Sequence, residues 1–157
     1  MITVRAAQPG DGAILFSTTW ELATSHGIPE TVTATAEDFE HALFRDDAVI
    51  GALIAFVDGV PAGTVVWHRS FSTNRGRETM YLEDLSVLPA FRRKGIAKVL
   101  LRETAKLALS KGYPSIYWLM MDWNEAARDL YKKVGAHIES GNSFCRIDGE
   151  ALKALAT

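Results

Sequence analysis

The sequence predicts an α/β fold in which antiparallel strands come first and a parallel β-α-β unit follows. Two apolar runs between residues 50 and 71 are separated by a Gly- and Pro-containing turn, which is typical of an antiparallel hairpin. Two further apolar runs, 79–87 and 115–121, are separated by a long amphipathic helix. Neighbouring parallel strands need such a crossover, so these two runs are expected to pair in parallel.

Composition limits the classes of function. The chain has 157 residues, 48% of them hydrophobic, and we expect one domain over 1–157 with a single core. A net charge of −2 gives no general reason to bind nucleic acid or an anionic membrane. The longest apolar run, 50–57, is too short to span a bilayer, and residues 1–5 lack the apolar core of a signal peptide. The only cysteine, Cys145, is expected to pack, and a cytoplasmic location fits.

The first half of the chain shows clear local signals. Residues 2–5 alternate as a strand does, and 79–87 is apolar on both faces, the pattern of a central covered strand. Thr35 and Asp38 fit a capping box that opens a short helix. The elements expected here are a strand at 2–5, helices at 11–24 and 35–44, and strands at 50–57, 62–71 and 79–87.

The second half begins with a helix over about 95–111, whose apolar residues fill one continuous arc. Asn124 is a good N-cap for a short helix. The elements expected after the long helix are a strand at 115–121, a helix at 125–133, a hairpin at 136–140 and 143–147, and a helix at 149–156. The whole chain therefore predicts about seven strands.

The start of the long helix predicts an anion site. Its first turn has unpaired backbone N–H groups and the positive end of the helix dipole. Gly95 allows a ligand to approach the backbone closely, and Arg92, Arg93 and Lys94 add positive charge. A solvated basic turn is the alternative. The spacing fits neither a Walker A loop nor a dinucleotide fingerprint.

Two stretches resemble the GNAT acetyltransferases. Residues 92–97 fit that superfamily's Arg/Gln-x-x-Gly-x-Gly/Ala loop, whose amides hold the pyrophosphate of acetyl-CoA. Residues 123–125 and 130–136 are similar to its second cofactor motif. Together with Arg146-Ile147-Asp148, they resemble the branch that contains the spermidine/spermine (diamine) and thialysine acetyltransferases.

The resemblance implies a GNAT fold with a mixed central sheet, in which strands 79–87 and 115–121 splay apart. It implies acetyl-CoA as co-substrate, with its pantetheine arm in that gap, and a homodimer. The cofactor-binding residues that it implies are Leu85, Ser86, Val87, Arg92, Arg93, Lys94, Gly95, Ile96, Ala97, Lys98, Asn124 and Ala127. Arg128 could reach a cofactor phosphate, or form a surface salt bridge.

Acetyl transfer to an amine requires a neutral amine, a polarised carbonyl and a stabilised leaving sulfur. Glu83 and Asp84 are adjacent on a strand, so they point to opposite faces unless a bulge intervenes. Salt bridges to Arg69, Arg75 or Arg77 would be a purely structural reason for them. The resemblance implies instead that Glu83 contacts the substrate amine and assists its deprotonation.

Tyr131 shares a helix face with Asn124, seven residues earlier. A core aromatic is the structural alternative for Tyr131, and simple N-capping is the alternative for Asn124. The resemblance implies that Tyr131 is the general acid toward the departing thiolate.

The substrate is expected to be a small-molecule amine bound by Glu83, Asp84, Ser25 and His26. Arg75 and Arg77 would repel a polycation and suit a substrate with a carboxylate, which favours a lysine- or thialysine-like amino acid over spermidine. Solvent exposure is the alternative for both arginines. A protein acetyltransferase and a non-catalytic CoA-binding module are the rival functions. The four histidines show no metal-ligand spacing, so no metal is expected.

Overall fold

A computed structural model describes residues 1–156, and it contains two compact units, one from Met1 to Met121 and a smaller one that begins at Asp122. The larger unit contains β1 (Ile2–Ala6), α1 (Gly12–Ser25), the 3₁₀ turn η1 (Pro29–Thr31), α2 (Ala36–Phe44), β2 (Gly51–Val57), β3 (Val60–Ser72), β4 (Arg77–Val87), the 3₁₀ turn η2 (Pro89–Phe91), α3 (Ile96–Ser110) and β5 (Ile116–Trp118). The smaller unit contains α4 (Glu125–Lys133) and α5 (Gly149–Leu155). Every helix in residues 1–156 is too short or too polar to cross a bilayer.

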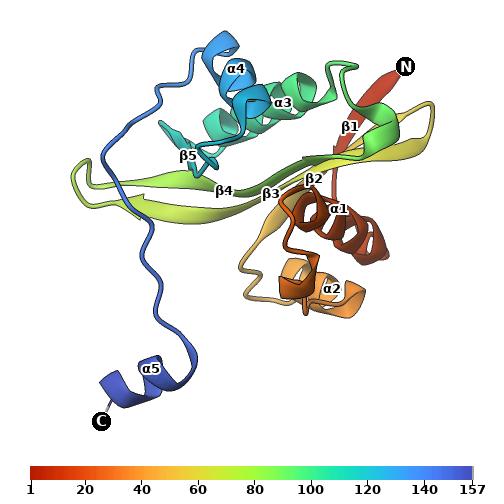
Figure 1. Cartoon of the computed structure of the whole chain (residues 1–157). Helices are drawn as coiled ribbons and strands as arrows, with labels where there is room; N and C mark the ends of the chain where they lie inside the picture. The colour runs from red at the N-terminus through yellow and green to blue at the C-terminus, as the bar shows by residue number, and fades with distance from the viewer. Residues whose placement is uncertain (157) are drawn as a thin grey trace. The chain divides into compact units, whose positions relative to one another are not determined.

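One mixed sheet forms the centre of the larger unit, with the strands in the order β1-β2-β3-β4-β5 (Figure 1). The first four strands pair antiparallel, whereas β4 and β5 pair in parallel. The parallel pairing covers only Met80–Leu82 of β4, although β4 continues to Val87. The expected order of antiparallel strands followed by a parallel pair is therefore confirmed.

Helices cover both faces of this sheet, with α1 and α2 on one face and α3 on the other (Figure 1). On the first face, Leu15 and Leu43 pack with Ala52, Ile54 and Val66 of the sheet. The apolar arc predicted for the long helix is confirmed, because its buried residues are Ile96, Leu100, Leu101, Thr104 and Ala108.

Buried hydroxyl groups fix α1 on the sheet. The Thr18 and Thr64 hydroxyls lie 2.8 Å apart within hydrogen-bond distance. The Ser86 hydroxyl donates to the backbone carbonyl of Thr18 at 2.9 Å. Because buried polar groups must find partners, these bonds specify how α1 lies against β3 and β4. The next residue on α1, Thr19, is consequently held over β4.

The capping box at Thr35 is present as predicted. The Asp38 backbone N–H donates to the Thr35 hydroxyl, and the Thr35 N–H donates to the Asp38 carboxylate at 2.7 Å. These two bonds satisfy donors that the helix itself leaves unpaired, so α2 begins at Ala36.

The hairpin predicted at 136–140 and 143–147 is wrong, and the described sheet has five strands instead of about seven. An isolated hairpin is marginal in water unless one face packs on something. Residues 139–156 are exposed, and Phe144 retains 75% of its accessible surface. Cys145, expected to pack, is also exposed. Without a packed face, these residues do not form strands.

Candidate active site

A β-bulge at Glu83 defines the most polar part of the sheet. In the β3–β4 register, Val66 pairs with Asp84 and Trp67 pairs with Leu82, so Glu83 has no partner of its own. A bulge places two residues opposite one and changes the direction of their side chains. Glu83 and Asp84 therefore lie on one face of the sheet. Opposite faces were expected from the sequence unless a bulge intervened, and the bulge is present.

Contacts identify that face as the one covered by α1. The Asp84 carboxylate accepts a hydrogen bond from the Thr19 side chain of α1. Glu83 lies beside His68, which stands two residues after Val66 on β3 and so shares its face. The two carboxylates are close enough for the charge of Glu83 to raise the pKa of Asp84.

Asp84 is half-buried, and burial is the main reason that its pKa rises to about 6. The negative charge of Glu83 raises this pKa further, while the Thr19 hydrogen bond opposes the rise. A carboxyl group with this pKa exchanges a proton near neutral pH. Such perturbed acids are concentrated at functional sites, although structural networks also produce them.

Glu83 is more exposed, with 59% of its side-chain surface accessible. The His68 Nε2 atom lies 3.7 Å from the Glu83 carboxylate, and the His68 ring stacks on Tyr81 with centroids 5.0 Å apart. Burial, followed by the charge of Glu83, raises the pKa of Tyr81. Arg69 pairs with Glu78 at 3.2 Å, so an arginine salt bridge does not explain either acid.

The backbone before α3 has the form expected of an anion site. Arg93 and Gly95 both adopt positive φ angles, of 63° and 79°. No side chain caps the helix, and Val99 is the residue whose N–H donates to the Gly95 carbonyl. The N–H groups of Ile96, Ala97 and Lys98 thus begin the helix without a side-chain cap. A left-handed non-glycine residue costs about 1–2 kcal/mol, which is typical of loops shaped for binding.

The basic side chains of this loop are used unevenly. Arg92 donates to the Val87 carbonyl at 3.1 Å and to the Glu21 carboxylate at 2.8 Å, so it ties the loop to the end of β4 and to α1. Lys94 donates to the Ala90 carbonyl at 2.9 Å. Arg93 and Lys98 are exposed. Arg92 and Lys94, which the sequence predicted as phosphate-binding residues, therefore stabilise the loop itself.

The edge of β4 beyond Leu82 has no strand partner on its β5 side among residues 1–156. The residues predicted to offer backbone groups to the acetyl carbonyl and pantetheine, Leu85, Ser86 and Val87, lie on this stretch. The Ser86 hydroxyl is committed to Thr18, so Ser86 could contribute only through its backbone.

In the smaller unit, Asn124 caps α4, and its side-chain oxygen accepts a bond from the Ala127 N–H at 3.0 Å. Arg128 forms ion pairs with Asp122 and Glu125, which is the surface salt-bridge alternative for that residue. Tyr131 is buried, and burial raises its pKa. A protonated phenol is the form that a general acid needs.

Ser25 and His26 lie at the C-terminal end of α1. The Ser25 hydroxyl donates to the Leu22 carbonyl, and the His26 N–H caps the helix. Arg75 and Arg77 are exposed at the β3–β4 turn. Arg77 starts β4 six residues before Glu83, roughly 20 Å away at the usual rise per strand residue. Arg77 is therefore too far from Glu83 to form the salt bridge that was the structural alternative for that acid.

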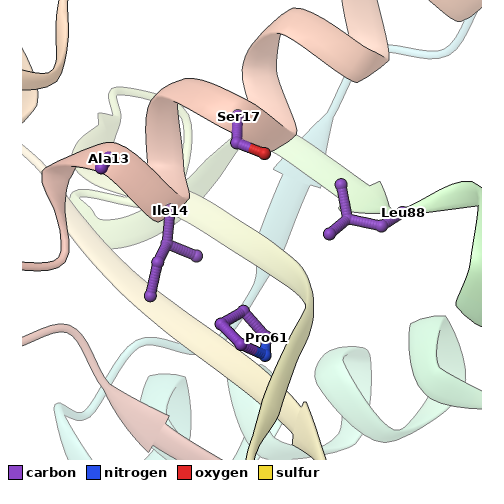
Figure 2. A pocket seen from close by; sticks show the side chains of 5 residues that line it. All are labelled: Ala13, Ile14, Ser17, Pro61 and Leu88. Carbon is purple, nitrogen blue, oxygen red and sulfur yellow. The ribbon is translucent and has the colours of Figure 1, made fainter.

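Figure 2 shows a separate pocket of about 330 Å³, lined by Ala13, Ile14, Ser17, Pro61 and Leu88. None of these side chains titrates, so the pocket offers no acid or base for chemistry. Within residues 1–156, no group of three or more His, Cys, Asp or Glu side chains could hold a metal ion.

Sequence reasoning missed His68, Tyr81 and Thr19 as members of this site. His68 lies on β3 and Thr19 lies on α1, so each approaches an acid of β4 only when these elements pack together. Tyr81 joins the site by stacking on His68. A signal existed only for Tyr81, which stands two residues before Glu83 on the same strand.

The larger unit therefore combines an uncapped helix start, an open edge of β4 and two paired acids within one α/β fold. The model of the acetyltransferase (GNAT) family matches residues 15–136. The thialysine N-epsilon-acetyltransferase of Bos taurus is 32% identical, over 99% of this chain and 97% of its own. An L-ornithine N5-acetyltransferase of Arabidopsis thaliana is 34% identical, over 62% of this chain and 43% of its own.

The fold is also found in a solved structure, an integron cassette protein of V. cholerae, with a TM-score of 0.80 and 21% identity, covering 99% of this chain and 97% of that one. The chain belongs to the GNAT acetyltransferase family. The resemblance seen in its two motifs is thereby confirmed, and it is an acetyl-CoA-dependent N-acetyltransferase.

Proposed function

We propose that the protein transfers the acetyl group of acetyl-CoA to the side-chain amine of a small amino acid such as lysine, thialysine or ornithine. The observation that carries this proposal is the pair of acids at the bulge, with Asp84 held by Thr19 and Glu83 open to solvent. Two adjacent carboxylates, one half-buried and one exposed, suit an ammonium group that must be bound and then deprotonated.

The chemical need for a base can be estimated. An alkylammonium group with a pKa near 10.4 must lose a proton before it can attack, which costs about 4–5 kcal/mol at pH 7. In the proposed mechanism Asp84 binds the ammonium group, and Glu83 accepts its proton directly or through water. The neutral amine then attacks the thioester carbon in a ternary complex.

The start of α3 is proposed to hold the pyrophosphate of acetyl-CoA. The N–H groups of residues 96–98 and the positive helix end attract an anion, and Gly95 keeps the loop in its left-handed form. The exposed Arg93 and Lys98 add charge. The open edge of β4 at Leu85–Val87 would receive the pantetheine arm, as extended amides bind at an unpaired strand edge.

Tyr131 is proposed to protonate the CoA thiolate. Its burial and raised pKa keep the phenol protonated until sulfur departs. Asn124 and Ala127 are proposed to contact the cofactor through the start of α4, where their mutual hydrogen bond fixes the loop.

The choice among small amines rests on the relatives, which are named for thialysine and for ornithine. Both names describe amino acids with a side-chain amine. Because Arg77 lies at the far end of β4 from the acids and Arg75 lies in the turn before it, neither arginine favours such a substrate over spermidine. Ser25 and His26 stay predicted contacts of the substrate. The homodimer and the cytoplasmic location also stay predictions.

A panel of amines tests the proposal. The purified protein is incubated with acetyl-CoA and with lysine, thialysine, ornithine, spermidine or a lysine-containing peptide, and the release of CoA thiol is measured. We expect the three amino acids to give the highest kcat/KM. A preference for spermidine or for the peptide would overturn the assigned substrate class, and an absence of thiol release with every amine would overturn turnover itself.

A further inference from the structure

His68 is placed between two acceptors. Its Nδ1 atom lies 3.1 Å from the backbone carbonyl oxygen of Arg69, and its Nε2 atom lies 3.7 Å from the Glu83 carboxylate. Stacking on Tyr81 holds the ring in this orientation. His68 belongs to neither cofactor motif, and its sequence neighbours give it no role.

The two acceptors determine what the ring can do. A carbonyl oxygen only accepts, so Nδ1 must carry the hydrogen of that contact. In neutral His68 the lone pair of Nε2 then faces the Glu83 carboxylate, whereas in the imidazolium form an N–H faces it. A proton that reaches Glu83 therefore has a second basic atom beside it, 3.7 Å away.

We propose that His68 takes the substrate's proton from Glu83 and passes it to solvent, which makes His68 a positioning and relay residue for the acetyl transfer. This inference rests on the proposed function. The ammonium group loses one proton to the Glu83 carboxylate, and that proton moves to Nε2 and then to water. The attacking nitrogen loses a second proton as the amide forms, and the departing thiolate gains one, so the reaction releases one net proton.

The position of His68 suits a release step. Its side chain is 36% exposed, so water reaches the ring, while the carboxylate beside it is more open still. A neutral His68 also restores the charge of Glu83 for the next ammonium ion. An imidazolium at this position would instead pair with Glu83 and compete with the substrate for the carboxylate.

Other titratable groups surround this pair and belong in the interpretation of any pH profile. Tyr81, Glu83 and Asp84 come from β4, and the ion pair of Arg69 with Glu78 joins β3 to β4. α1 carries Glu21, which pairs with Arg92, and His26 at its C-terminal end. Among residues 1–156, His68 on β3 is the ion-pair partner of the Glu83 carboxylate on β4.

The test compares His68→Gln with His68→Phe. Gln keeps a polar contact but cannot take up a proton, and Phe keeps the stacking on Tyr81. For both variants we expect kcat at pH 8 to fall about tenfold, KM for the amine to change less than about twofold, and the acidic limb of the pH profile of kcat/KM to move to lower pH. The acidic limb moves to lower pH because the Glu83 carboxylate is then the only proton acceptor of the pair, and a carboxylate is protonated at lower pH than an imidazole.

Controls separate the possible failures. His41→Gln changes a histidine on α2 and should leave the profile unchanged. Thermal melting verifies that each variant is folded, and His68→Asn replaces any that is not. An unchanged acidic limb in both variants, or a rise in KM with unchanged kcat, would overturn the relay. An unaltered protein that acetylates no amine would instead overturn the proposed function.

Discussion

The loop before α3 and the polar cluster on β3 and β4 differ in how they are built. The loop is local: Arg92, Arg93 and Gly95 are consecutive or nearly so, and their φ angles shape it. The cluster is non-local, because His68, Glu83 and Thr19 come from three elements. A site built from consecutive residues can be predicted from a sequence motif. A site that depends on the register between strands cannot be predicted until the pairing of the strands is known.

The largest effect should come from the cluster. Glu83→Gln keeps the size of the side chain but removes its basicity, so we expect kcat to fall about 10³-fold with little change in stability. Steady-state rates with the best amine measure this loss. If Gln at this position turns over at the rate of the unaltered protein, Glu83 is not the base and the cluster is structural.

Tyr131→Phe should follow, with kcat lower by about 10²-fold, because the CoA thiolate then departs without a proton donor. Phe fills nearly the same buried volume, so the variant is expected to fold. The matched measurement is the melting temperature. Unchanged turnover with several amines would remove the general-acid role.

Asp84→Asn tests the electrostatics of the cluster. The pKa of Asp84 rises from 3.8 to about 6 in the folded protein, so the ionised form disfavours folding. The stability that the protonated form contributes is complete below pH 3.8 and is lost as pH rises through 6.

This rise corresponds to about 3 kcal/mol in full, and partial exposure brings it nearer to about 2 kcal/mol. We therefore expect Asp84→Asn to be more stable than the unaltered protein at pH 8, by up to that amount, and to lose this advantage at pH 3.5. Urea unfolding at a series of pH values measures the difference. A constant difference across the series would contradict the assigned pKa.

The loop should respond more weakly, through Gly95→Ala. Gly95 has a φ of 79°, and Gly112, just after α3, has a φ of 75°, and neither has an atom within 4 Å of an added Cβ. Ala at either position should cost about 1–2 kcal/mol of unfolding free energy. Only Gly95→Ala should also raise KM for acetyl-CoA, by about fivefold. An equal rise in Gly112→Ala would mean that strain, and not phosphate binding, explains it.

The same contrast explains what the sequence could predict. Helix α4 was predicted with its bounds, and α1, α2 and α3 within a residue or two, because caps, glycines and apolar arcs are local. The bulge at Glu83 was left open, since nothing in the sequence of 79–87 decides whether this strand carries an extra, unpaired residue. His68 was missed for the same reason. The hairpin predicted at 136–140 and 143–147 was wrong, because an isolated pair of strands needs a packed face and residues 139–156 are exposed.

A crystal structure with coenzyme A and lysine would test the central proposal most directly. We expect the pyrophosphate within hydrogen-bond distance of the N–H groups of residues 96–98. We also expect the lysine side-chain nitrogen to contact Glu83 or Asp84 on the face covered by α1. A lysine amine bound away from both carboxylates, with the cofactor in place, would contradict it.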